Sequence, residues 1–347
     1  MTVDAMRVGE FHVVPGKVVS RIIEANQHNL IELVRNAYIE HEKGNTINPD
    51  SYFLRFPDQP SNRIIALPAC IQDDQPMSGI KWIGSYPANI QNGIPRASAI
   101  VILNDVKTGY PIAMMEAAVI SSNRTAASAV LTAQYCAPKG KRAAHVSFVG
   151  AGIIARTILS TMIGDNWSID RISIFDLNRT SSNAFAEFAN EKVSGTAMVV
   201  DSLEEALTAD IVCFATSVGT PYVSDSKSFR PGQVVLNVSL RDIAPELILQ
   251  ADNIFDDVEH CMKANTSPHL AEQMTGGRTF VTGTIADLVT GKLVLSHTRP
   301  VIVSPFGLGV LDIALARYVL TTALDQGDTV EIPNFFGELH RWPTKAG

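Results

Sequence analysis

The chain has 347 residues, enough for two domains with hydrophobic cores, and its 46% hydrophobic and 18% charged residues are ordinary for a soluble globular enzyme. A net charge of −7 argues against nucleic acid as the main partner, no apolar run is long enough to span a membrane, and the start Met1–Asp4 lacks the features of a signal peptide. The four cysteines form no Cys-x-x-Cys pair and the histidines lack metal-ligand spacing, so we expect reduced thiols in the cytoplasm and no metal site.

The N-terminal part of the chain is predicted to be a helix packed on a largely antiparallel sheet. Apolar residues at helical spacing predict one helix over 17–43, with Gly44 as its C-cap. Trp82 is expected in the core, and turn-forming residues over 104–109 predict a hairpin between the last two strands. The predicted strands are 63–67, 79–84, 99–103 and 110–115.

A glycine-rich turn is the most informative feature of the chain. After a helix predicted over 116–137, the apolar run 146–149 leads into Gly-x-Gly-x-x-Ala and then a helical pattern. Gly150 would permit the tight turn, and Gly152 would let a pyrophosphate approach the N–H groups at the helix N-terminus. The order of strand, turn and helix favours a dinucleotide site over an ordinary loop.

The residues that follow extend this nucleotide-binding pattern. Asp176 ends the next predicted strand, 171–175, where a carboxylate binds ribose hydroxyls and favours NAD over NADP. Arg179 lies close by in sequence and could weaken that preference. Further strands are predicted at 209–216, 233–238, 253–255 and 300–303, before a helix over 309–324 that returns to the first domain.

One acidic residue stands where chemistry is expected in such a sheet. Asp242 directly follows the predicted strand 233–238, so its carboxylate could orient a substrate amine or move a proton beside the nicotinamide. The same position suits a helix N-cap before Pro245, and position alone does not separate the two interpretations. His260 lies among acidic residues in a segment that resembles a solvated loop.

Basic residues gather in the first predicted domain. Each alone is more typical of a solvated face or an ion pair, but five of the six cations within residues 55–124 of this acidic protein together indicate a pocket for anions. They are Arg55, Arg63, Lys81, Arg96 and Arg124.

Several segments together resemble the ornithine cyclodeaminase/μ-crystallin family over nearly the whole chain. They are 79–82, 109–112, the Arg-Thr-Ala-Ala element at 124–127, the glycine turn and Ser-Pro-Phe-Gly at 304–307. The resemblance implies an α/β protein in which a Rossmann domain with a doubly wound parallel sheet, residues 126–305, is inserted in a discontinuous α+β domain. That domain, residues 1–125 and 306–347, would bind substrate and form a homodimer.

The resemblance also implies roles for individual residues. Arg55, Lys81 and Arg124 match substrate-carboxylate positions, with Arg63 and Arg96 as further candidates. Asp242 matches the catalytic aspartate, and Lys81 is expected to take part in catalysis. The residues expected to bind NAD are Thr125, Gly150, Gly152, Ile153, Ile154, Asp176, Thr216, Ser217 and Ser239.

Within the family, segments 63–68, 78–85 and 96–98 most resemble members that oxidise a glutamate adduct to 2-oxoglutarate and L-2,3-diaminopropionate, a precursor of siderophores and peptide antibiotics. Ala66 stands where ornithine cyclodeaminases have a glutamate that recognises a diamine. We therefore expect a small amino-acid substrate and no nucleic acid or membrane partner. The alternatives are an ornithine cyclodeaminase or ketimine reductase, and a μ-crystallin-like protein that binds NAD(P) or a small ligand without turnover.

Overall fold

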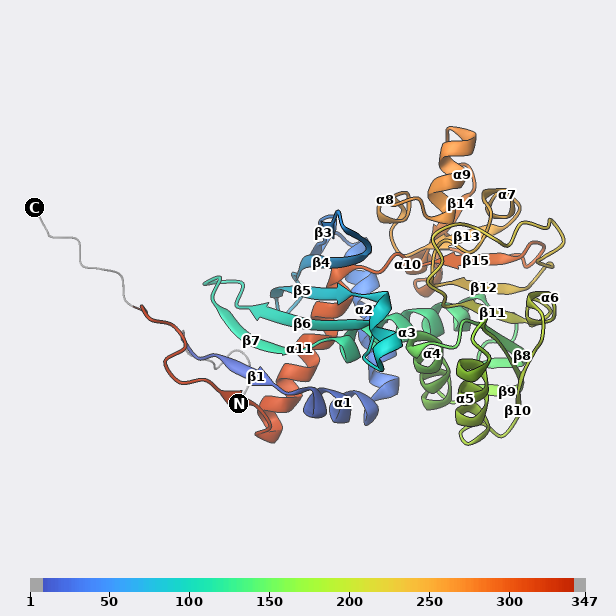
Figure 1. Cartoon of the computed structure of the whole chain (residues 1–347). Helices are drawn as coiled ribbons and strands as arrows, with labels where there is room; N and C mark the ends of the chain where they lie inside the picture. The colour runs from blue at the N-terminus through green and yellow to red at the C-terminus, as the bar shows by residue number, and fades with distance from the viewer. Residues whose placement is uncertain (1–8, 340–347) are drawn as a thin grey trace, which may run out of the picture. The chain divides into compact units, whose positions relative to one another are not determined.

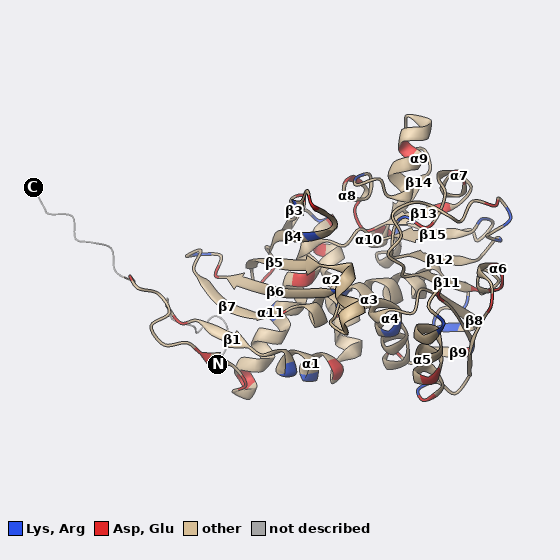
Figure 2. Cartoon of the chain, viewed as in Figure 1, with Lys and Arg blue, Asp and Glu red and all other residues tan. Residues whose placement is uncertain are grey.

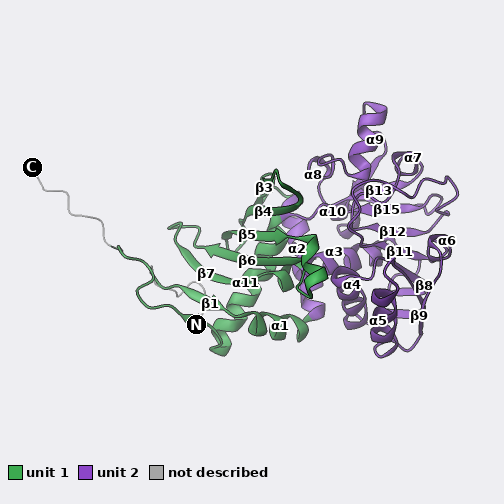
Figure 3. Ribbon diagram, viewed as in Figure 1, with its two compact units in different colours: residues 1–26, 43–121, 309–347 green, residues 27–42, 122–308 purple. Residues whose placement is uncertain are grey.

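A computed structural model describes residues 9–339 of the chain (Figure 1). The start Met1–Asp4, for which no signal peptide is predicted, lies outside the described residues. The chain divides into two compact units, each assembled from separate segments (Figure 3). Unit 1 comprises residues 1–26, 43–121 and 309–347, and unit 2 comprises residues 27–42 and 122–308.

Unit 1 is built on a mostly antiparallel sheet with the order β16-β1-β7-β6-β5-β4-β2, in which β3 also pairs with β4. Only the β1–β7 pair is parallel. The helix α11 crosses β4, β5 and β6 (Figure 1). The elements are β1 (His12–Val14), α1 (Gly16–Glu24), β2 (Thr46–Ile47), β3 (Tyr52–Phe56), β4 (Gln59–Ile71), β5 (Met77–Ser85), the 3-10 helix Pro87–Asn92, β6 (Ala97–Asn104), β7 (Pro111–Glu116), α11 (Gly309–Gln326) and β16 (Val330–Glu331).

The two faces of this sheet differ sharply in burial. Leu67, Lys81, Val101 and Met115 face each other across β4, β5, β6 and β7, and all four are buried on the face that α11 covers. Since neighbouring residues of a strand point to opposite faces, Trp82 lies on the other face. Its side chain is 41% exposed, so the expectation that Trp82 is a core residue was wrong.

Unit 2 holds a sheet in which every pair is parallel, with the order β10-β9-β8-β11-β12-β15-β13-β14. This is the doubly wound Rossmann arrangement predicted from the sequence: β8, β9 and β10 follow one another toward one edge of the sheet, and the later strands, beginning with β11, lie on the other side of β8. The elements are α2 (Gln27–Glu42), α3 (Ala118–Cys136), which begins in unit 1, β8 (Arg142–Val149), α4 (Ile153–Gly164), β9 (Ser168–Phe175), α5 (Arg179–Asn190), β10 (Thr196–Val199), α6 (Leu203–Ala206), β11 (Ile211–Phe214), β12 (Val234–Asn237), α7 (Pro245–Ile248), β13 (Asp252–Phe255), α8 (Val258–Cys261), α9 (Ser267–Thr275), β14 (Val281–Thr284), α10 (Ile285–Val289) and β15 (Val301–Ser304).

The long helix predicted over 17–43 is two helices. α1 ends at Glu24, and the side chain of Asn26 donates to the carbonyl of Ile22, which caps the break. α2 then clusters with unit 2, whereas the sequence-based boundary placed all of 1–125 in the first domain. The Tyr38 hydroxyl on α2 lies 2.7 Å from the Ser128 hydroxyl on α3, so α2 is anchored to that unit.

The helices of residues 9–339 include none with the length and apolar character that crossing a membrane requires.

Candidate active site

The glycine turn follows β8, the strand of unit 2 on either side of which the strand order runs in opposite directions. Gly150 follows β8 with φ +98°, and a β-carbon there would lie 2.6 Å from the carbonyl oxygen of Ala215 after β11. Only glycine is therefore accommodated at this position. Gly152, the N-cap of α4, has an ordinary φ of −79° and nothing within 4 Å of its missing β-carbon.

The N-terminus of α4 fits the phosphates of a dinucleotide. No side chain in the described part of the chain caps the helix, so its first N–H groups are directed at the open space beside Gly152. Ile153, the first residue of α4, is 66% exposed, and Ile154 is half-buried. The structure thus places three of the expected cofactor residues around one unfilled helix end.

Asp176 lies beside this turn, at the end of β9. Its carboxylate accepts a hydrogen bond of 2.7 Å from the N–H of Ala151 and another of 2.7 Å from the N–H of Asn178. Arg179, which could have weakened a preference for NAD, forms an ion pair of 2.7 Å with Asp201. Asp176 therefore braces the glycine turn and keeps lone pairs for further donors, because a carboxylate has about four acceptor sites.

Asp242 is the most completely enclosed acid among the predicted site residues, with a relative exposure of 0%. Its Oδ1 accepts hydrogen bonds from the hydroxyls of Thr216, at 2.6 Å, and Tyr222, at 3.0 Å. Its Oδ2 accepts a hydrogen bond from Ser239. The N-cap interpretation was wrong, because Ala244 occupies the N-cap of α7.

Thr216 and Ser239 were predicted to bind the cofactor, but in the structure their hydroxyls donate to Asp242. Ser217, beside them, is exposed, and Thr125 on α3 is half-buried. Tyr222 was missed because no motif contains it. A parallel bridge between Val223 and Ile243 brings it to Asp242, and sequence spacing gives no sign of that pairing.

The turn that presents Asp242 is unusual. Leu240 has φ +71°, a left-handed conformation that is unfavourable for a branched, non-glycine residue. Its N–H donates to Asn237, and its carbonyl accepts a hydrogen bond of 2.7 Å from the N–H of Ser267. The backbone strain that these bonds maintain lies next to the predicted catalytic acid, which is typical of functional sites.

Three of the predicted substrate-binding arginines come together in unit 1. Arg55 on β3 pairs directly with Arg63 on β4, which pairs with Ser85 on β5. The guanidinium of Arg96 donates to the Ser85 hydroxyl at 2.6 Å. Register places Arg55 and Arg63 side by side at one end of a sheet face, and the hydrogen bond to Ser85 brings Arg96, just before β6, to the same end.

The charges of these arginines interact. Burial lowers the pKa of Arg63, and the nearby Arg55 lowers it further. Burial likewise lowers the pKa of Arg96, with a second contribution from Arg63. Arg55 is exposed and lies over the ring of Phe53, 5.0 Å from its centroid. A cluster of like charges is unfavourable without an anion, so this arrangement fits the binding of carboxylates.

Lys81 occupies the same sheet face but a different environment. Its side chain is buried, and its Nζ donates to Asp312 on α11 at 2.7 Å and to Ser121 at 3.1 Å. Removing either charge would leave the other buried without this ion pair, which is costly. The sequence did carry a signal for this pair, since Asp312 is an isolated acid in the apolar stretch 310–316.

Arg124 on α3 contacts the Ser-Pro-Phe-Gly loop, 304–307. Gly307 has φ +95°, and a β-carbon there would collide with the Arg124 guanidinium. The loop is also held by Asp256, which accepts hydrogen bonds from the N–H groups of Phe306 and Gly307. Two of the segments that carry the family resemblance thus meet in unit 2.

The acidic segment around His260 is not the solvated loop that its sequence suggests. Asp256 is 3% exposed and His260 is 8% exposed. Asp257 caps α8 and lies 3.0 Å from a ring nitrogen of His41 on α2 and 3.0 Å from one of His260. Hydrogen bonds from the two histidines hold the pKa of Asp257 below its usual range, against the effect of burial. The segment therefore fastens α2 and the loop 304–307 to unit 2.

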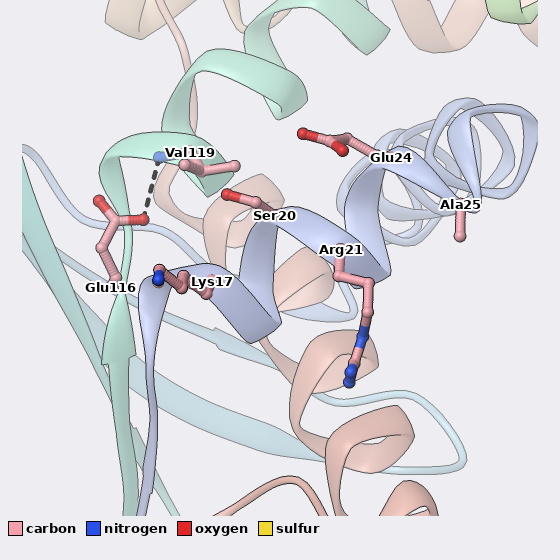
Figure 4. A pocket seen from close by; sticks show the side chains of 8 residues that line it. Lys17, Ser20, Arg21, Glu24, Ala25, Glu116 and Val119 are labelled. Atoms are coloured by element: carbon pink, nitrogen blue, oxygen red, sulfur yellow. Dashed lines mark hydrogen bonds between the residues drawn. The ribbon is translucent and has the colours of Figure 1, made fainter.

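A separate hollow of about 680 Å³ lies on unit 1, along α1 and the start of α3 (Figure 4). Lys17, Arg21 and Glu24 give α1 charges of both signs (Figure 2). The carboxylate of Glu116 in this hollow accepts hydrogen bonds from the N–H groups of Ala118 and Val119 at the start of α3. None of the predicted site residues lines it, so we do not assign the chemistry to this hollow.

The model of the ornithine cyclodeaminase/mu-crystallin family matches residues 17–327. The N-((2S)-2-amino-2-carboxyethyl)-L-glutamate dehydrogenase of Staphylococcus aureus is 28% identical over 308 residues, which cover 85% of this chain and 90% of that protein.

Two solved structures have a similar fold. The crystal structure of CmnK, 27% identical, superposes with a TM-score of 0.85 and covers 94% of this chain and 99% of that chain. An archaeal alanine dehydrogenase, described as a dimer with bound NAD, is 24% identical and has a TM-score of 0.83, covering 94% of this chain and 100% of that chain.

Proposed function

Because this chain belongs to the ornithine cyclodeaminase/mu-crystallin family, we propose that it is an NAD-dependent dehydrogenase acting on the C–N bond of N-(2-amino-2-carboxyethyl)-L-glutamate. The products would be 2-oxoglutarate and L-2,3-diaminopropionate. The observation that carries the choice of substrate is the cluster of Arg55, Arg63 and Arg96. Three cations at one end of a sheet face suit a substrate with three carboxylates. The Staphylococcus aureus relative is named for this activity.

We assign cofactor binding to unit 2. The uncapped N-terminus of α4 and the open space at Gly152 fit a pyrophosphate, and Asp176 would accept hydrogen bonds from ribose hydroxyls. The chemistry that NAD supplies is acceptance of a hydride from the glutamate α-carbon. Because Arg179 is paired with Asp201, we expect no compensation for a 2′-phosphate and tighter binding of NAD than of NADP. Calorimetry with both cofactors tests this.

We assign the remaining chemistry as follows. The arginine cluster would bind substrate carboxylates, while Lys81, held by Asp312, and Arg124, packed against Gly307, would supply further positive charge. Asp242 would orient the secondary amine and accept a proton while the imine is hydrolysed. Ala66, which pairs with Trp82 and Tyr52, offers no acidic partner for the second ammonium of ornithine.

We also propose a homodimer formed through the sheet face of unit 1 that carries Trp82. Pro68, Ile80, Ile102 and Met114 face one another on four neighbouring strands of this face, and all four are only half-buried. An apolar surface of this kind is typical of an interface. A second copy is the occupant we favour, since the archaeal alanine dehydrogenase of the same fold is described as a dimer. The four cysteines are free thiols, which supports a cytoplasmic location.

The deciding experiment is incubation with NAD and either the glutamate adduct or ornithine, followed by mass spectrometry. We expect NADH, 2-oxoglutarate and 2,3-diaminopropionate from the adduct and little or no proline from ornithine. Asp242→Asn should abolish most turnover while keeping the fold and cofactor affinity, because an amide cannot accept the proton. Proline from ornithine without cleavage of the adduct would establish a cyclodeaminase instead. Tight NAD binding without turnover of either would indicate a μ-crystallin-like binding protein.

A further inference from the structure

The carboxylate of Asp242 is fully buried, and both of its oxygens accept hydrogen bonds. The donors of these hydrogen bonds determine how the carboxylate is oriented. The three side-chain donors that residues 9–339 supply to it are all hydroxyls. Those of Thr216 and Ser239 belong to the loops that follow β11 and β12, where cofactors bind in doubly wound sheets. The third, Tyr222, comes from a segment outside that pattern.

Tyr222 is attached to Asp242 by its backbone as well as by its side chain. The N–H groups of Tyr222 and Val223 both donate to the Asp242 carbonyl, at 3.0 and 2.9 Å. The N–H of Ala244 donates back to the Val223 carbonyl at 2.8 Å. These bonds fix the start of the Tyr222 side chain relative to the carboxylate, so the contact of 3.0 Å between the phenol and Oδ1 is built into the fold.

The phenol is a permanent donor in this setting. Tyr222 is 39% exposed, and the partial burial of its phenol raises the pKa above its ordinary value, with a further contribution from the neighbouring charge of Asp242. Cys213 on β11 responds in the same way, since burial raises the pKa of its thiol and Asp242 adds to the effect. The Tyr222 phenol and the Cys213 thiol therefore remain protonated at neutral and acidic pH. A fall in activity as the pH is lowered below neutral would not come from either group.

We propose that Tyr222 is a positioning residue that orients Asp242 and stabilises its carboxylate form. This rests on the proposed role of Asp242 in proton transfer. A hydroxyl that donates to a carboxylate favours the charged form, and a phenol is a stronger donor than the aliphatic hydroxyls of Thr216 and Ser239. Without Tyr222, the Asp242 carboxylate would lose one donor to its charged form and one constraint on its orientation.

Tyr222→Phe tests this, because it removes the hydroxyl and keeps the ring. We expect the acid-side midpoint of kcat/KM to move up by about one pH unit, the shift that corresponds to losing one charge-assisted hydrogen bond. We also expect kcat to fall several-fold, with the dissociation constant for NAD within about twofold of wild type. Tyr135→Phe is the matched control, since its hydroxyl on α3 is not among the hydroxyls that bind Asp242 within residues 9–339. It should change neither quantity.

A second measurement does not depend on the substrate. Carbon NMR of protein labelled at aspartate carboxyl carbons, with Asp242 assigned through Asp242→Asn, follows the titration of this group in the absence of any reaction. Tyr222→Phe should raise its midpoint, and 3-fluorotyrosine at position 222, a stronger donor of the same shape, should lower it.

The two measurements separate the proposals. An unchanged midpoint in folded Tyr222→Phe protein would overturn the role of Tyr222, and so would a midpoint unchanged by 3-fluorotyrosine if the Phe variant does not fold. Absence of turnover in the wild type, with the two opposite midpoint shifts present, would overturn the proposed function while leaving the role of Tyr222 intact.

Discussion

At the scale of single residues, Gly150 and Gly152 belong to one motif, but the first serves the fold and the second serves the proposed cofactor site. Gly150 has a left-handed backbone and faces the Ala215 carbonyl, whereas Gly152 has an ordinary backbone and open space. The two glycines look equivalent in sequence, but the reasons for their presence differ. Gly150 is required by the backbone conformation of the turn, whereas Gly152 leaves room for the pyrophosphate that we propose binds there.

This difference predicts opposite outcomes for two alanine variants. Gly152→Ala should keep the free energy of unfolding within about 1 kcal/mol of wild type, because no atom is displaced. It should lower NAD affinity by at least about tenfold, since a methyl group would occupy the phosphate site. Gly150→Ala should lose stability as well, by about 2 kcal/mol. Urea denaturation and calorimetry measure both quantities, and unaltered NAD affinity in Gly152→Ala would contradict the placement of the pyrophosphate.

His145 provides a prediction about pH. Burial lowers its pKa to about 4, with a contribution from Arg171. The unfolded chain, with an ordinary histidine pKa of about 6.5, takes up the proton more readily. The stabilisation from neutral His145 is therefore complete above about pH 6.5 and is lost as the pH falls toward 4.

The change attributable to His145 should be about 1 kcal/mol, because the half-buried ring is partly screened by solvent. Urea denaturation of wild type and His145→Gln at pH 7 and pH 5 checks this. The variant should lose less stability between the two pH values than wild type does. An identical loss in both proteins would show that other groups govern the acid sensitivity.

At the scale of elements, the sequence predicted what local periodicity and turn chemistry determine. The parallel strands, the hairpin of β6 and β7 and the glycine turn were confirmed. β3 was missed because its residues do not alternate in polarity, and the break at Asn26 was missed because helical spacing continues across it. Tyr222 could not be predicted, since its place depends on pairing between distant segments.

The arginine cluster is likewise a product of strand register. A shift of one residue between β3 and β4 would turn Arg55 to the opposite face from Arg63. The sequence predicted that these cations serve one pocket, but it grouped them with Lys81, which the structure shows paired with Asp312. Strand pairing places Arg55 next to Arg63, whereas Lys81 lies further along the sheet face and forms an ion pair with Asp312.

Arg63→Gln should therefore raise KM for the glutamate adduct by about tenfold or more, since one charge-assisted contact is lost. Its free energy of unfolding should stay the same or rise at low salt, because repulsion from Arg55 and Arg96 is relieved. Steady-state kinetics and urea denaturation test the two parts. Arg35→Gln, which removes a cation from a surface pair with Glu32, is the control. A loss of stability without a change in KM would make Arg63 structural.

At the scale of the whole molecule, the apolar sheet face of unit 1 determines the proposed assembly. Trp82→Glu places a charge on that face and should convert the dimer to monomer in analytical ultracentrifugation, because a buried unpaired carboxylate is costly. Val106→Glu, on the exposed β6–β7 turn, should leave the dimer intact. A dimer unaffected by Trp82→Glu would place the interface elsewhere.

The ion pair between Lys81 and Asp312 affects when unit 1 can fold during translation. The two residues are 231 positions apart, and β1 pairs with β16 over an even longer stretch, as His12 with Glu331. At about 5–20 residues per second, a ribosome needs roughly 10–50 s to reach Asp312 after making Lys81. Most of unit 2 is synthesised in that interval as one continuous segment, 122–308. The sheet of unit 1 can therefore acquire α11 only after the segment 122–308 has been synthesised, and the buried charge of Lys81 is not neutralised by Asp312 before then.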